Sequence, residues 1–562
     1  MASGCQSFFF LLLFFQCTWF IIPSEFFSPL TAFGQYAEPS FIAAKQKNSK
    51  IAQEYSEQRL QISINGLPKC SYQQNQCRRI GIIGGGAAGL YCGILLAEAG
   101  HTVTIFEATD RAGGRILTYR DPKNPTKYMG EFGAMRFPLS RHPYLNQLIR
   151  ERYKLNITEF SSPDDNAYTY INGILTRNKQ ARENPDIFQF NTSASERGKT
   201  PNRLFSDALQ TIHQTFFNGG WSAVVKQWDS YSMDSYLHHM NLSRAAIDYI
   251  AISRGSEGFL FTSIVESVRS INLPASDDKL YQIRDGNDQL VRSMVDDCRA
   301  IQSNRCSILY STPINQVQLL ASNEIQLRTN NGTNQIFDTV VVATSPTVAQ
   351  LFEFEPRRDF IQKYLALRQV HYICSSKILL FFNVSWWYVQ EHISGGSSTS
   401  DLPIRSIYYP KTTSNQTDGG TLLASYTLGP NSIIWQSLSD SDAIELVLQQ
   451  LIQIHRNSSN MRNYFQGGKV KHWCQDPHVR GAFAYLIPFQ ETELVDKLEA
   501  SVSNVHFIGE YTSFVHGWVE GALSSAIRVA EAITIESEIT VPTNGLQKIE
   551  QLYDLEINGS IY

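Results

Sequence analysis

The order of apolar and polar residues over positions 79–107 predicts a strand, a tight turn, a helix and a second strand. Ile80, Ile82 and Ile83 form a short run of β-branched residues, which is typical of a buried parallel strand. The run stops at a glycine cluster, after which apolar residues recur at helical spacing as far as Gly100. A second apolar run at 103–106 completes a strand–helix–strand unit, so the pattern favours an α/β fold.

Further along the chain, the pattern separates helical from strand-rich segments. Residues 176–271 have helical periodicity and predict an inserted helical domain, whereas strand patterns return at 307–310, 314–319, 325–327 and 339–343. The last of these, VVVAT, is again typical of a buried parallel strand, so we expect it to rejoin the first sheet. Residues 370–382, 401–410 and 421–429 predict a mixed, substrate-facing sheet.

Two features of the later segments suggest specific roles. Lys377 lies among apolar neighbours, and the residues alone favour a lysine at a strand edge whose ammonium reaches water. A strand at 505–509 precedes a helix in which Ala522, Ala526 and Ala530 recur every fourth position. These alanines predict a narrow face that packs closely on a neighbouring element.

Composition is that of a globular protein with more than one core. A chain of 562 residues favours two or three packed domains. The net charge of −4, without an arginine-rich tract, gives no reason to expect a nucleic-acid partner. Zinc-type cysteine spacing is also missing from the sequence, so we expect no metal site.

The N-terminus is typical of a secreted protein. Residues 8–15 are apolar and resemble the hydrophobic region of a secretory signal, although no Lys or Arg precedes Lys45 to form the usual basic region. We expect a signal peptide over 1–34, with a membrane anchor as the alternative. Eight N-x-S/T sequons fit an extracellular glycoprotein. They begin at Asn156, Asn191, Asn241, Asn331, Asn383, Asn415, Asn457 and Asn558.

The cysteines fit the same route. Cys70 with Cys77 and Cys298 with Cys306 are close enough in sequence to close small disulfide loops, although spacing does not give connectivity. Cys92 lies in the first predicted helix and is expected to be a buried thiol.

The first turn carries the clearest binding signal. Gly84, Gly86 and Gly89 form G-x-G-x-x-G, in which the glycines permit the turn, a close approach to a pyrophosphate and close helix packing. Glu107 ends the second strand, where a carboxylate can accept hydrogen bonds from ribose hydroxyls. An ordinary glycine turn is the alternative, and the motif does not separate NAD from FAD.

Arg136 is the second candidate. It lies in GEFGAMRFP, an apolar context in which an unpaired charge is costly. Its partner is either a protein carboxylate or an acidic ligand held by the guanidinium.

With these motifs assembled, the sequence resembles the flavin-containing amine oxidase superfamily, and within it the secreted L-amino-acid oxidases of the venom type. The resemblance covers residues 79–532 and rests on GIIGGGAAGL, VTIFEATDRAGGRILTYR, GAMRFP, GGSSTSDLPIRSIYYP and FIGEYTSFVHGWVEGALSSAIRVA. It implies a discontinuous FAD-binding Rossmann-like domain (78–110, 280–350 and 495–535), a mixed-sheet substrate-binding domain (111–175 and 365–494) and a helical domain (176–275).

The resemblance also implies site residues. Lys377, Arg136 and Tyr426 would be catalytic, with Lys377 holding a water near the flavin. The residues expected to contact FAD are Gly84, Gly86, Ala87, Ala88, Gly89, Glu107, Ala108, Arg115, Gly133, Ala134, Met135, Arg136, Ile314, Trp473, Glu510, Gly517, Trp518 and Val519. Those expected to contact substrate are Arg136, Tyr426, Leu428, Phe483, Gly517 and Trp518.

The implied activity is oxidation of free L-amino acids by oxygen to 2-oxo acids, ammonia and hydrogen peroxide, with an antimicrobial role by analogy and a homo-oligomer as one possible assembly. Alternatives on the same fold are a polyamine or monoamine oxidase, a flavin-dependent fatty-acid double-bond isomerase and a non-catalytic toxin or binding protein. Phe483 and Leu428 favour apolar substrates, whereas Glu257 leaves a basic amino acid possible as substrate. Ser270 replaces a family histidine proposed as a base or gate, so that histidine is dispensable or substrate entry differs.

Overall fold

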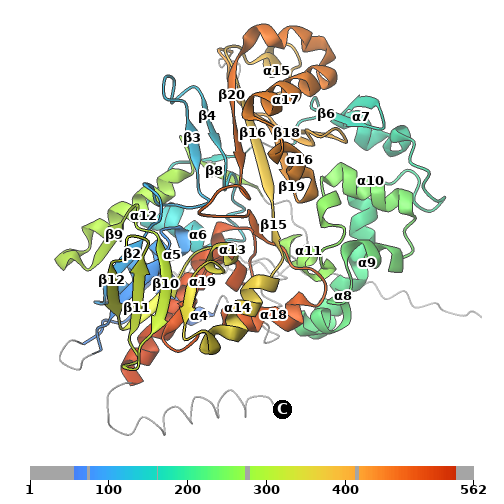
Figure 1. Ribbon diagram of the computed structural model, residues 1–562. Coiled ribbons are helices and arrows are strands. Elements are labelled where there is room, and N and C mark those ends of the chain that lie inside the picture. The colour runs from blue at the N-terminus through green and yellow to red at the C-terminus, as the bar shows by residue number, and fades with distance from the viewer. Residues whose placement is uncertain (1–55, 72–75, 161–162, 272–278, 412–416, 540–562) are drawn as a thin grey trace, which may run out of the picture.

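The computed structural model describes residues 56–71, 76–160, 163–271, 279–411 and 417–539 (Figure 1). The predicted signal peptide, the sequons at Asn415 and Asn558 and the side chain of Ser270 lie outside the described residues. Among the described residues, no helix has both the length and the apolar character that crossing a bilayer requires.

A five-stranded parallel sheet forms the base of the molecule. Its strand order is β22-β13-β1-β2-β9, with bounds Val505–Phe507, Thr339–Val342, Arg79–Ile83, Thr102–Phe106 and Cys306–Leu309. The predicted strand–helix–strand unit is confirmed, with α5 at Ala87–Glu98 between β1 and β2. The VVVAT strand pairs in parallel with β1, as predicted, and β22 pairs with VVVAT. Three segments far apart in sequence therefore share one sheet.

The sheet is buried on both faces because its side chains alternate between two cores. Ile80 and Ile82 pack with α5 and with α19 (Val519–Ile539), whereas Ile83 packs with the second sheet. Ala526 and Ala530 are fully buried in the first core, which agrees with the narrow alanine face predicted for this helix. The second sheet has the order β12-β11-β10-β14, with bounds Asn334–Phe337, Ile325–Thr329, Ile314–Leu319 and Glu353–Glu355.

A seven-stranded mixed sheet stands above this base (Figure 1). Its order is β20-β16-β19-β18-β17-β6-β7, with bounds Phe465–His472, Ser375–Phe382, Gly420–Leu428, Ser406–Tyr408, Ser397–Ser400, Tyr168–Ile171 and Ile174–Arg177. The predicted strand at 370–382 is divided into β15 (Tyr372–Ile373) and β16. Within 401–410 only β18 forms, and β17 precedes that range. Lys377 of β16 lies directly opposite Tyr426 of β19 in the antiparallel pairing.

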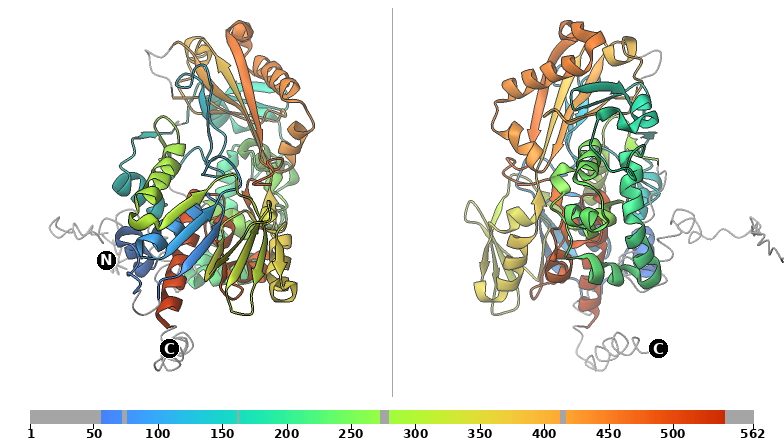
Figure 2. Two further views of the ribbon diagram at one scale, coloured as in Figure 1. Left: turned by 60° about the vertical axis from the view of Figure 1, so that its left-hand side comes forward. Right: turned by 90° about the vertical axis from the view of Figure 1, so that its right-hand side faces the viewer.

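The predicted helical segment is confirmed. It contains α8 (Pro201–Trp228), α9 (Met233–His239), α10 (Arg244–Arg254) and α11 (Ile264–Ile271) around a core of its own. Figure 2 shows these helices, in green, grouped on one side of both sheets. Remaining helices include α4 (Glu57–Asn65), α6 (Pro143–Asn146), α12 (Asp288–Ala300), α14 (Ile361–Gln369), α16 (Pro430–Gln436), α17 (Asp440–Ile454) and α18 (Gln490–Glu499). Short strands include β3 (Thr118–Arg120), β4 (Met129–Glu131), β5 (Ile157–Glu159), β8 (Tyr281–Ile283) and β21 (Phe483–Ala484).

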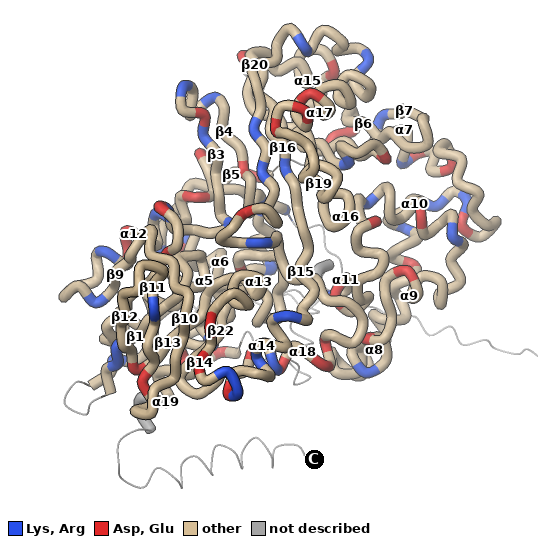
Figure 3. The backbone as a smooth tube through the Cα atoms, viewed as in Figure 1, with Lys and Arg blue, Asp and Glu red and all other residues tan. Residues whose placement is uncertain are grey.

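Disulfides bear out the predicted short loops. Cys70 pairs with Cys77 and Cys298 with Cys306, and Cys92 is a buried free thiol. A third disulfide, Cys374–Cys474, joins positions 100 residues apart and was not predicted. Charged residues of both signs are interspersed along the outer helices and loops (Figure 3).

Candidate active site

One cavity of about 550 Å³ lies where the parallel sheet, the mixed sheet and the helical segment meet. Most of the predicted site residues line it. They are Gly84, Gly86, Ala87, Ala88, Glu107, Arg115, Gly133, Ala134, Met135, Arg136, Lys377, Tyr426, Trp473, Phe483, Glu510, Gly517, Trp518 and Val519.

The glycine turn has the geometry that a close-approaching ligand requires. Gly84 has φ 110°, which L side chains rarely adopt. A Cβ at Gly89 would lie 2.0 Å from the carbonyl oxygen of Gly84, so only glycine lets α5 pack this closely on β1. A Cβ at Gly86 would meet no protein atom within 4 Å, and this residue caps α5 without a side chain. The open space at Gly86 and the N-terminal N–H groups of α5 fit a phosphate.

Glu107 is aimed at the same turn. Its Oε2 accepts a hydrogen bond from the Gly85 amide at 2.9 Å, and its Oε1 accepts from the Thr109 amide at 2.9 Å. The carboxylate is therefore held at the end of β2, where a ribose would lie beside the turn.

Glu510 and Arg115 form an ion pair at the cavity wall, in which the carboxylate is buried and the guanidinium is partly exposed. Arg115 Nη1 lies 2.9 Å from Glu510 Oε1, and the Tyr372 hydroxyl donates to the same oxygen at 2.7 Å. Burial raises the pKa of Glu510, but the charges of Arg115 and His516 and the hydrogen bonds from Tyr372 and Arg115 together outweigh it and hold the pKa below its ordinary value. Because Glu510 Oε2 also accepts from the Gly517 amide at 3.1 Å, the ion pair fixes the Gly517–Trp518 turn. Tyr372 was not predicted as a site residue.

Arg136 has no carboxylate partner among the described residues, so the protein-carboxylate interpretation is not supported. Its guanidinium carbon lies 5.3 Å from the centre of the Tyr408 ring and 5.8 Å from that of Phe160. The Tyr408 ring in turn lies 6.3 Å from the Tyr426 ring. Burial raises the pKa of Tyr426 to about 12, so the phenol keeps its proton and can donate a hydrogen bond. An arginine and a neutral tyrosine thus share one side of the cavity.

The strand-edge interpretation of Lys377 is wrong. The residue is 2% exposed, because β16 is an interior strand flanked by β19 and β20. Its Nζ donates to the carbonyl oxygens of Gly133 at 2.7 Å and Glu131 at 3.2 Å, and lies 4.8 Å from the centre of the Tyr426 ring. Burial lowers the pKa of Lys377 to about 7, with Arg136 adding to the effect. The side-chain amine can therefore gain or lose a proton near neutral pH.

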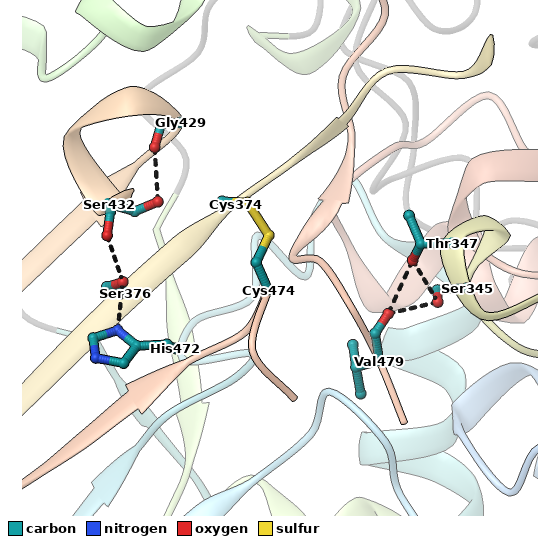
Figure 4. Close-up of a disulfide and its surroundings, with 9 residues drawn as sticks. All are labelled: Ser345, Thr347, Cys374, Ser376, Gly429, Ser432, His472, Cys474 and Val479. Atoms are coloured by element: carbon teal, nitrogen blue, oxygen red, sulfur yellow. Dashed lines mark hydrogen bonds between the residues drawn. A yellow bond between two sulfur atoms is a disulfide. The ribbon is translucent and has the colours of Figure 1, made fainter. Parts of the chain in front are cut away.

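The Cys374–Cys474 disulfide lies close to residues of the cavity wall in sequence, and Figure 4 shows it with its surroundings. It ties the start of β16 to the segment that follows β20. In that segment Trp473 is 3% exposed and its Nε1 donates to the Phe132 carbonyl at 2.9 Å. The same segment leads to Phe483, whose ring would be 3.3 Å from a Cβ at Gly517. The disulfide therefore anchors the strand connection that places both aromatic residues.

Four predicted site residues do not line the cavity: Gly89, Ala108, Ile314 and Leu428. Gly89 lies beneath the turn, where it sets the helix packing. Ile314 is 6% exposed because its side chain packs into the second core with the second sheet. Leu428 packs against the cluster that contains Trp473 and Phe483, so it supports the wall from behind. Contact of these four residues with cofactor or substrate stays a prediction.

A buried charged network beside the cavity was not predicted. His516 lines the cavity, and its Nδ1 lies 3.0 Å from Glu266 Oε2, which itself pairs with Arg269 Nη1 at 2.9 Å. Arg269 also pairs with Glu491, whose Oε1 accepts a hydrogen bond from Trp221 Nε1 at 3.2 Å. The network joins α8, α11 and α18 to the turn that carries Gly517. In the sequence, only the i, i+3 spacing of Glu266 and Arg269 gives any signal of it.

Glu257, the residue that left a basic amino acid possible as substrate, does not line the cavity. Its carboxylate pairs with Arg405 and accepts a hydrogen bond from Asn431. The acid is therefore occupied by the protein's own cation.

Solved structures of similar shape define the class of fold. Cyclohexylamine oxidase from Brevibacterium oxydans IH-35A superimposes with a TM-score of 0.65 at 19% identity, over 82% of this chain and 100% of that one. A putrescine oxidase gives a TM-score of 0.64 at 18% identity, over 82% and 99% of the two chains. At these identities the likeness shows an α/β fold with a Rossmann-like parallel sheet and a mixed sheet.

The family follows from sequence. The model of the flavin containing amine oxidoreductase family matches residues 87–534, and the chain belongs to that family. An L-amino-acid oxidase of Siganus canaliculatus is 35% identical over 85% of this chain and 88% of its own length. An L-amino-acid oxidase of Pseudechis australis is 31% identical over 86% of this chain and 91% of its own length.

Proposed function

We propose that the protein catalyses the FAD-dependent oxidative deamination of free L-amino acids, releasing 2-oxo acids, ammonia and hydrogen peroxide. The observation that carries the proposal is Arg136: a cation in the cavity that no carboxylate of the described chain neutralises. The family membership and the similarity to L-amino-acid oxidases support the same chemistry.

The residues present fit an FAD. The open space at Gly86 and the N-terminus of α5 would hold the pyrophosphate, and Glu107 would accept hydrogen bonds from the ribose. Trp473 and the Gly517–Trp518 turn, fixed by Glu510, would hold the other end of the cofactor. Bound FAD would take a hydride from the substrate and pass the electrons to oxygen.

Arg136 and Tyr426 would bind the substrate carboxylate. The guanidinium supplies a charge-assisted hydrogen bond, and the neutral phenol adds a second donor. Held at its carboxylate, the amino acid presents its α-carbon in one orientation, and positioning of this kind lowers a barrier without an obligatory acid or base. Ser270 in place of the family histidine is compatible with this mechanism.

Lys377 would supply positive charge during the oxygen reaction. Because its pKa is about 7, the ammonium is present below that pH and lost above it. We expect kcat/KM for oxygen to fall as pH rises through about 7, and Lys377→Met to lower it by about 10- to 100-fold and abolish the pH step. Stopped-flow measurement of the oxygen reaction checks this, over a pH range from about 5.5 to about 9 that brackets the titration of Lys377.

Lys363 provides a matched control for that experiment. Burial lowers its pKa to about 7 as well, but its Nζ donates to the Leu498 carbonyl at 2.7 Å, and it does not line the cavity. Lys363→Met should keep the pH step in correctly folded, flavin-loaded protein. If both variants lose the step, or neither does, Lys377 does not provide the charge.

The amine-oxidase alternative is tested with matched substrates. Each L-amino acid is compared with the amine left by its decarboxylation, since the two differ only in the carboxylate that Arg136 would bind. The proposal predicts oxidation of the amino acids at least about 100-fold more efficiently than of the amines. Preference for the amines would favour a monoamine or polyamine oxidase, and isomerisation of unsaturated fatty acids under anaerobic conditions would favour the isomerase.

Secretion is part of the same proposal. Three disulfides join six cysteines of the described chain, and disulfides form and persist in oxidising compartments. We expect an extracellular protein from which residues 1–34 have been removed, and the mass of the N-terminal peptide of the mature protein tests this.

A further inference from the structure

The carboxylates that line the cavity all have partners within the protein, whereas some of the cations that line it have no carboxylate partner among the described residues. Its carboxylates are Glu107, Asp476 and Glu510. Glu107 accepts hydrogen bonds from the backbone amides of Gly85 and Thr109. Asp476 pairs with Lys471, and Glu510 pairs with Arg115. No carboxylate lining the cavity in the described chain is therefore available for a basic substrate side chain.

Arg254 is a cation on the wall formed by the helical segment. It is the last residue of α10, and its guanidinium carbon lies 4.6 Å from the centre of the Phe205 ring. Its Nη1 donates to the Asn202 side-chain oxygen at 2.6 Å. These two contacts orient the guanidinium, and no carboxylate of the described chain pairs with it. An arginine has five N–H donors, so others remain for a ligand.

Arg254 is connected to the surroundings of Arg136 through the turn that follows it. The next residue, Gly255, has φ 61° and ends the helix; a Cβ there would lie 3.5 Å from Ser406 Oγ. Ser406 pairs with Tyr426 in the mixed sheet. The turn after Arg254 thus packs on the strands that place Tyr426 and Tyr408, the aromatic neighbours of Arg136. The wall nearby is apolar, with Phe205, Phe259 and Met233 among its residues.

Resting on the proposed amino-acid oxidation, we propose that Arg254 binds the distal carboxylate of acidic L-amino acids while Arg136 binds the α-carboxylate. Arg136 and Arg254 are two of the cations along this cavity that lack a carboxylate partner in the described chain, and together they attract a dicarboxylate and repel a cationic side chain. The occupied Glu257 removes the acid that would otherwise have favoured lysine or arginine. Substrates of this class are L-aspartate, L-glutamate and L-2-aminoadipate, which differ in the distance between their two carboxylates.

The test is kcat/KM for peroxide production by the flavin-loaded protein with these three acids, L-glutamine, L-leucine, L-lysine and L-arginine. At least one acidic substrate should exceed L-lysine by about tenfold or more. Arg254→Gln should lower kcat/KM for that acid by about tenfold, chiefly through KM, and change the value for L-leucine by less than about threefold. Arg254→Glu should reverse the preference between the acid and L-lysine.

Arg244→Gln is the matched control, because Arg244 begins the same helix and pairs with Asp234 and Asp248 away from the cavity. It should leave the substrate ratios unchanged. Basic or apolar amino acids as the best substrates, with ratios insensitive to Arg254→Gln, would overturn the inference while leaving amino-acid oxidation intact. If no amino acid is oxidised at all, the proposed function itself fails.

Discussion

Arg136→Ala is expected to lower kcat/KM for the best amino acid by at least about 100-fold, corresponding to about 3 kcal/mol of lost binding to the reacting substrate. Removing the guanidinium leaves a carboxylate in a partly desolvated cavity with only the Tyr426 hydroxyl to bind it. Both KM and kcat should be affected, because the carboxylate contact also orients the α-carbon. Steady-state kinetics by peroxide detection checks this.

Two controls separate substrate binding from damage to the cofactor site. Flavin content per polypeptide is measured because Gly133, Ala134 and Met135, next to Arg136 in sequence, also line the cavity. Arg136→Lys retains the charge but loses the planar fork, so it should fall between wild type and Arg136→Ala. A loss of about tenfold or less in Arg136→Ala, with full flavin content, would mean that the carboxylate site is misassigned.

Gly86→Ala and Gly89→Ala should fail in different ways. In Gly89→Ala the added methyl would lie 2.0 Å from a backbone oxygen of Gly84, which cannot move without separating α5 from β1. We expect little folded protein. In Gly86→Ala no protein atom lies within 4 Å of the added methyl, so the chain should fold but bind FAD at least about tenfold more weakly, because the methyl takes the space of the pyrophosphate.

Gly93→Ala, in the same helix, completes the series. Its methyl would lie 2.9 Å from the end of the Ile105 side chain, which can rotate, and alanine favours the helix. Soluble yield, thermal unfolding of the apoprotein and flavin titration distinguish the three variants. Normal FAD affinity in Gly86→Ala would contradict the position assigned to the pyrophosphate.

The local parts of the fold were predictable because they depend on residues close in sequence. The spacing of apolar residues gave the strand–helix–strand unit, and the short loops between cysteines gave two disulfides. VVVAT was recognisable as an interior strand because a parallel strand buried on both faces is apolar throughout. The family resemblance then brought together residues from β1, β16 and α19 that no local pattern connects.

The features that the sequence did not predict are contacts between residues far apart in the chain. Lys377 was assigned to a sheet edge from the residues alone, since nothing in 370–382 shows that β19 and β20 flank it on both sides. Cys374 and Cys474 are separated by 100 residues, so spacing could not pair them. Arg254 is an ordinary helix C-terminal arginine in sequence, and only the packing of α10 on the mixed sheet brings it to the cavity. The same holds for His516 and Glu266.

The central claim is oxidation of free L-amino acids. Its most direct test is a screen of the purified, FAD-loaded protein against all proteinogenic L-amino acids, with D-enantiomers as controls and with peroxide and ammonia measured together. The account predicts equimolar peroxide and ammonia from a subset of the L-amino acids and none from their D-enantiomers. A correctly folded, yellow protein that yields neither product from any amino acid would contradict it.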